Sequence, residues 1–92
     1  MQYVTPITEN QTQFTLDESF GSHELNFWRV SDTRVHIQSR DPDISRQLRR
    51  LKSARRVAYG CLGGHLEVYS VAMSGPQAAQ WVQERIQVYI SP

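Results

Sequence analysis

Two similar groups of segments follow one another along this chain, each a pair of β-prone runs and then a proline-opened helix. The first pair covers residues 23–31 and 34–40, and its second run alternates apolar and polar side chains. The second pair covers residues 57–61 and 65–72 around Gly63-Gly64, a dipeptide that permits the positive φ angles of a tight hairpin turn. Hairpins and amphipathic helices bury their apolar faces against one another in layers. The sequence therefore predicts an α+β two-layer sandwich in ββαββα order, with an antiparallel sheet.

Both helices have recognisable start signals. Asp41 suits the N-cap, Pro42 suits the first helical position, and Asp43 favours the positive end of the helix dipole. Apolar residues then recur at helical spacing, which gives one buried stripe of Ile44, Leu48 and Leu51. Ser74-Gly75-Pro76 opens the second helix, whose apolar face is predicted to hold Ala78, Trp81, Val82 and Ile86.

The chain has 92 residues, 39% of them hydrophobic and 21% charged, which suits one globular domain over residues 1–92. Within it, residues 1–22 are expected to form either a separate edge hairpin, from Tyr3–Ile7 and Gln13–Leu16, or a partly disordered arm. Residues 17–22 are predicted to be a loop. The single cysteine excludes an internal disulfide and favours a cytoplasmic, reducing location. No apolar run is long enough to predict a membrane span.

Basic residues are concentrated in one segment, although the net charge is only +1. Residues 40–56 contain seven basic and two acidic residues, and no acid occurs within residues 46–56. Nine of the ten basic residues are arginine, whose planar guanidinium suits phosphate and carboxylate groups. We expect the basic side chains to form one ridge along the first helix and its flanks, made of Arg40, Arg46, Arg49, Arg50, Lys52, Arg55 and Arg56. Phosphate binding by such a ridge would depend strongly on salt.

The pairing expected for the first hairpin places aromatic and cationic side chains together on an exposed face. A turn at Asp32-Thr33 would bury Trp28, Val30, Val35 and Ile37. The opposite face would then collect Leu25, Phe27, Arg29, His36, Gln38 and Arg40. Binders of single-stranded nucleic acid use such mixed faces, so Phe27, Arg29 and His36 are predicted to assist the ridge. The alternatives are a cover by the N-terminal hairpin, a solvated face, or a homodimer that buries Phe27 and Tyr69.

The second hairpin argues against catalytic and metal chemistry. A turn at Gly63-Gly64 would pair Cys61 with Leu66 and place Cys61 and His65 on opposite faces. These two side chains could then form neither a nucleophile–base pair nor a shared metal site. The glycines of residues 60–64 lack the Lys-Ser/Thr that follows a phosphate-binding loop. We therefore expect no enzyme activity, no metal and no cofactor.

Two functions remain from different classes. The leading hypothesis is a non-enzymatic domain that binds DNA or RNA through its arginine-rich helix. The alternative is a protein–protein interaction module, an adaptor or an inhibitor, whose partner is an acidic protein surface or a second copy of the chain. Nucleic-acid binding would weaken steeply with salt, whereas a protein interface would depend on apolar contacts.

Overall fold

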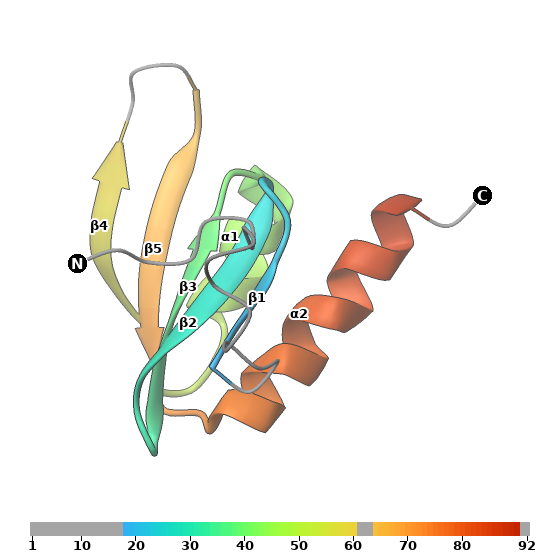
Figure 1. Ribbon diagram of the computed structural model, residues 1–92. Helices are drawn as coiled ribbons and strands as arrows, with labels where there is room; N and C mark the ends of the chain where they lie inside the picture. The colour runs from blue at the N-terminus through green and yellow to red at the C-terminus, as the bar shows by residue number, and fades with distance from the viewer. Residues whose placement is uncertain (1–17, 61–63, 91–92) are drawn as a thin grey trace, which may run out of the picture.

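Five strands form one antiparallel sheet, and two helices cover one of its faces, in the computed structural model, which describes residues 18–60 and 64–90 (Figure 1). The strands are β1 (Ser19–Gly21), β2 (Leu25–Ser31), β3 (Arg34–Ser39), β4 (Arg55–Gly60) and β5 (Leu66–Val71). The helices are α1 (Pro42–Arg49) and α2 (Gly75–Ile90). Neighbouring strands follow the order β1-β2-β3-β5-β4, so that β5 lies between β3 and β4. The predicted α+β class is confirmed, with one strand more than the two expected hairpins supply.

The predicted helix starts are confirmed. The Asp41 carboxylate accepts a hydrogen bond from the backbone N–H of Asp43 at 2.7 Å and from that of Ile44 at 3.4 Å. Pro42 follows at the start of the helix, where its missing N–H costs no hydrogen bond. The second helix begins at Gly75, and its backbone is helical to Ile90. Local capping therefore positions both helices along the chain.

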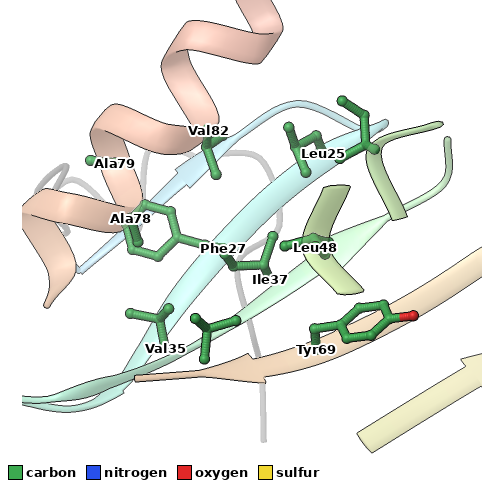
Figure 2. Close-up of a cluster of buried hydrophobic side chains, with 11 residues drawn as sticks. Leu25, Phe27, Val35, Ile37, Leu48, Tyr69, Ala78, Ala79 and Val82 are labelled. Atoms are coloured by element: carbon green, nitrogen blue, oxygen red, sulfur yellow. The ribbon is translucent and has the colours of Figure 1, made fainter. Parts of the chain in front are cut away.

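The hydrophobic core lies between the sheet and both helices (Figure 2). Strands β2, β3 and β5 each contribute two side chains to it, which are Leu25, Phe27, Val35, Ile37, Tyr69 and Val71. The helices contribute Ile44, Leu48, Ala78, Ala79 and Val82. Burial of each large apolar side chain stabilises the fold by about 1.5–3 kcal/mol, so this single layer holds both helices to the sheet.

A β-bulge changes the faces of the first hairpin. The turn lies at Asp32-Thr33 as predicted, but the register shifts between Arg29 and Ser31, so Val30 is an extra residue in β2. Phe27 consequently pairs with Ile37 on the helix side and is fully buried, whereas Val30 is 45% exposed. The predicted exposure of Phe27 and burial of Val30 are therefore wrong. A shift of one residue exchanges the two faces of a strand.

The second hairpin is also out of its predicted register by one residue. Gly60 pairs with Leu66, and a second bulge lies between Arg56 and Ala58. Tyr69 faces the helices and is 2% exposed, so it does not lie on the exposed face that the homodimer alternative needs. Residues 61–63, which include Gly63 of the predicted Gly63-Gly64 turn, lie outside the described residues.

The predicted loop over residues 17–22 contains a strand. Ser19–Gly21 forms β1, in which Phe20 pairs with Phe27 of β2. Gly21 has a φ of +146°, and a Cβ there would lie 2.2 Å from the Asn26 Cα, so this close pairing requires glycine. The expected hairpin from Tyr3–Ile7 and Gln13–Leu16 lies outside the described residues. Neither helix has the length and apolar character that a membrane crossing requires over the part of the chain described.

Candidate nucleic-acid interface

The basic residues of the predicted ridge occupy several different environments. Arg46 forms an exposed ion pair with Asp43, one turn earlier on α1. Arg49 and Arg56 both contact Glu67 of β5. Three exposed cations of the ridge remain: Arg50 and Lys52 lie between α1 and β4, and Arg55 is the first residue of β4. Their side chains form no hydrogen bond or ion pair with another described residue. Arg40, at the other end of α1, is half-buried, and its Nε has no partner among the described residues.

Glu67 of β5 forms ion pairs with two arginines, Arg49 and Arg56. Its Oε2 accepts a hydrogen bond from Arg56 Nη1 at 2.9 Å, and its Oε1 lies 3.7 Å from Arg49 Nη2. Tyr69 Oη donates to Glu67 Oε1 at 2.8 Å and accepts from Arg49 Nε at 3.1 Å. Burial raises the pKa of Glu67, but the hydrogen bonds from Tyr69 and Arg56 and the charges of Arg49 and His65 outweigh it, so the pKa lies below its ordinary value. Glu67 is therefore an anion that partly neutralises both guanidinium groups.

Arg56 also stacks on an exposed aromatic ring. Its guanidinium carbon lies 4.5 Å from the centroid of the Tyr59 ring, and Tyr59 is 68% exposed. Residues three apart in a regular strand point to opposite faces, but the bulge after Arg56 places both side chains on the same face. The pair offers a flat, cationic surface of a kind on which a base can stack.

A serine, a histidine and a glutamate approach one another beneath α1. Ser45 Oγ lies 2.8 Å from His65 Nε2, and Glu67 Oε1 lies 3.8 Å from the same nitrogen. A catalytic triad needs the carboxylate on the other ring nitrogen, where it orients the base. Ser45 is also fully buried, and its hydroxyl donates to Ser39 Oγ at 3.2 Å. This geometry links α1 to the sheet and does not match that of an activated nucleophile.

The sheet-face residues predicted to assist the ridge are not brought together. Phe27 belongs to the core, and Arg29 Nη1 donates to Asp32 Oδ1 at 2.9 Å beside the turn. His36 pairs with Trp28 on the face away from the helices, where the two rings meet edge to face with centroids 5.7 Å apart. Burial, with a smaller contribution from the charge of Arg34, lowers the pKa of His36 and favours its neutral form. The structure therefore removes Phe27 from the candidate interface and separates His36 from Arg29.

An open pocket that the sequence did not predict lies at the start of β3 and β4. It has a volume of about 350 Å³ and is lined by Arg34, Ser53, Arg55, Val57 and Ser70. Arg34 Nη1 donates to Ser70 Oγ at 2.9 Å, although the two residues are 36 positions apart. Only the pairing of β3 with β5 joins them, so no local pattern could have identified the pocket.

Comparisons with models of protein families, with curated proteins and with solved structures found no match to this chain. Among the residues that the structure describes, no three metal-ligating side chains of His, Cys, Asp or Glu lie together.

Proposed function

We propose that this domain binds nucleic acid through phosphate contacts made by Arg50, Lys52 and Arg55. The observation that carries the proposal is that these three cations lie within six consecutive positions, exposed and without a carboxylate partner in the described part of the chain. Neighbouring like charges repel one another, and a polyanion would relieve that repulsion. Backbone phosphates supply such an anion at regular spacing, and they release counterions when they bind.

The Arg56–Tyr59 pair supports single-stranded nucleic acid as the ligand. The bases of a single strand can stack on an exposed ring, whereas the bases of a duplex already stack on one another. Tyr59 and Arg55 belong to the same edge strand but point to opposite faces of the sheet, so a strand of nucleic acid that contacts both would cross the edge at β4. The proposed role is non-enzymatic, and the single cysteine supports the reducing cytoplasm as its location.

The test is fluorescence anisotropy with labelled single- and double-stranded oligonucleotides at several salt concentrations. The variant Arg50→Gln/Lys52→Gln/Arg55→Gln should lose binding, and intermediate variants should show a shallower salt dependence, by about 0.7 in the log–log slope for each lost single-strand phosphate contact. The matched control is Arg29→Gln/Arg46→Gln, which removes two cations that already have carboxylate partners. Arg49 is avoided because its loss would disturb Tyr69 and Glu67. No binding at low salt, or equal losses in both variants, would reject the proposal.

A protein-interaction module is the second candidate, favoured by the exposed edge of the sheet. Among the described residues, β4 has only one neighbouring strand, and its Val57 and Tyr59 are 46% and 68% exposed. A free edge with apolar side chains can add a strand from an acidic partner or from a second copy. Sedimentation equilibrium tests the homodimer directly. A concentration-dependent dimer that persists in high salt would favour this candidate over nucleic-acid binding.

A further inference from the structure

The pocket between β3, β4 and β5 has the chemistry of an anion site. Arg34 opens β3, Arg55 opens β4, and neither forms an ion pair with a described carboxylate. No acidic residue occurs among the described residues that line the pocket. Two guanidinium groups therefore lie in one pocket, and no described carboxylate neutralises their charge.

Two serine hydroxyls add hydrogen-bond donors to the same pocket. Ser70 Oγ accepts from Arg34, and Ser53 Oγ accepts from the backbone N–H of Ala72 at 2.8 Å. Neither hydroxyl donates to an acceptor among the described residues, so both protons remain for a ligand. Ser70 is 6% exposed, and its oxygen accepts a hydrogen bond from Arg34. The position of its side chain is therefore fixed by the surrounding fold. Both guanidinium groups and both hydroxyls of the pocket can therefore donate hydrogen bonds to a ligand.

We propose that this pocket binds a phosphate monoester group. Such a group carries close to two negative charges at neutral pH and three acceptor oxygens, which match two guanidiniums and two hydroxyls. A carboxylate or an internal phosphodiester carries one charge and would leave one guanidinium unbalanced. Val57 supplies an apolar wall, and a volume of about 350 Å³ leaves room for part of the attached molecule. The monoester comes either from a free small molecule or from the terminal phosphate of a nucleic-acid strand, and the second source rests on the proposed function.

The direct test is a titration with phenyl phosphate, followed by ¹H–¹⁵N correlation spectra and calorimetry, with benzoate as the matched carboxylate. Phenyl phosphate should shift the amide signals of Ser53, Arg55 and Ser70 in a saturable manner. Arg34→Gln and Ser53→Ala should each weaken binding, the arginine change by about tenfold or more. Arg29→Gln is the control, since Arg29 pairs with Asp32 and does not line the pocket. Neither pocket variant alters Arg50, Lys52 or Arg55, and the melting temperature of each variant establishes that it is folded.

The outcomes separate this inference from the proposed function. No saturable shift with phenyl phosphate, equal affinity for benzoate, or unchanged binding by folded Arg34→Gln would overturn the phosphate site. Tighter binding of a 5′-phosphorylated oligonucleotide than of its 5′-hydroxyl counterpart, lost in Arg34→Gln, would identify a strand end as the source. Equal binding of the two oligonucleotides, with phenyl phosphate still bound, would support a free small molecule. If no oligonucleotide binds but phenyl phosphate still does, the proposed function is rejected and the phosphate monoester site is supported.

Discussion

The Tyr69 hydroxyl donates a 2.8 Å hydrogen bond to the Glu67 carboxylate, two positions earlier on the same face of β5. Burial raises the pKa of Tyr69, and the bond to Glu67 raises it further. The same bond lowers the pKa of Glu67. Each group therefore stabilises the protonation state of the other, a neutral phenol beside an anionic carboxylate.

Tyr69→Phe should destabilise the fold by about 1–3 kcal/mol, because it removes a donor from a buried carboxylate and an acceptor from Arg49 while it keeps the apolar ring. Urea denaturation at neutral pH measures the loss. Tyr59→Phe is the control and should change stability by less than about 0.5 kcal/mol, since Tyr59 is 68% exposed. Equal effects of the two changes would contradict the buried hydrogen bond.

Stability should fall in acid because of Glu67. Its pKa is lower in the folded chain than its ordinary 4.5, so the unfolded chain takes up the proton first as the pH falls. The contribution of Glu67 is present above pH 4.5 and is lost as the pH falls through the lowered value. Urea denaturation of Glu67→Gln from pH 7 to pH 3 should show a flatter profile than the wild type. Glu84→Gln, a change in a side chain that is 60% exposed, is the control for the loss of a carboxylate at the surface.

Phe27 and Val30 test the bulge in β2. Phe27→Ala should cost about 3–5 kcal/mol, because the ring is fully buried in the core. Val30→Ala should cost less than about 0.5 kcal/mol, because this side chain is 45% exposed. Thermal or urea denaturation compares the two variants. A regular hairpin without the bulge would reverse the order of the two losses.

The N-cap of α1 should contribute measurably to stability. Asp41→Ala removes the acceptor for two backbone N–H groups and should cost about 0.5–2 kcal/mol. Asp43→Ala removes an exposed ion pair with Arg46 and should cost less, about 0.2–1 kcal/mol. Chemical denaturation of both variants gives the comparison. A larger loss for Asp43→Ala would mean that the ion pair, and not the cap, holds the start of the helix.

The candidate interface was only partly predictable. The basic composition of residues 40–56 and the absence of acids among residues 46–56 are visible in the sequence. The sequence does not show which of these cations have a carboxylate partner, because Arg49 and Arg56 pair with Glu67, a residue of β5. The Arg56–Tyr59 stack depends on a bulge that leaves no local composition signal.

The sequence by itself determined the elements whose causes are local. Asp41-Pro42-Asp43 and Ser74-Gly75-Pro76 start helices because caps and fixed φ angles act within a few residues. Tertiary structure decided the register of both hairpins, the order of the sheet and the meeting of Arg34 with Ser70. The physical reason is that a one-residue bulge exchanges the two faces of a strand, and the face that is then buried must fill the core against both helices. Burial of Phe27 together with Leu25 favours that arrangement, and it depends on residues far apart in the chain.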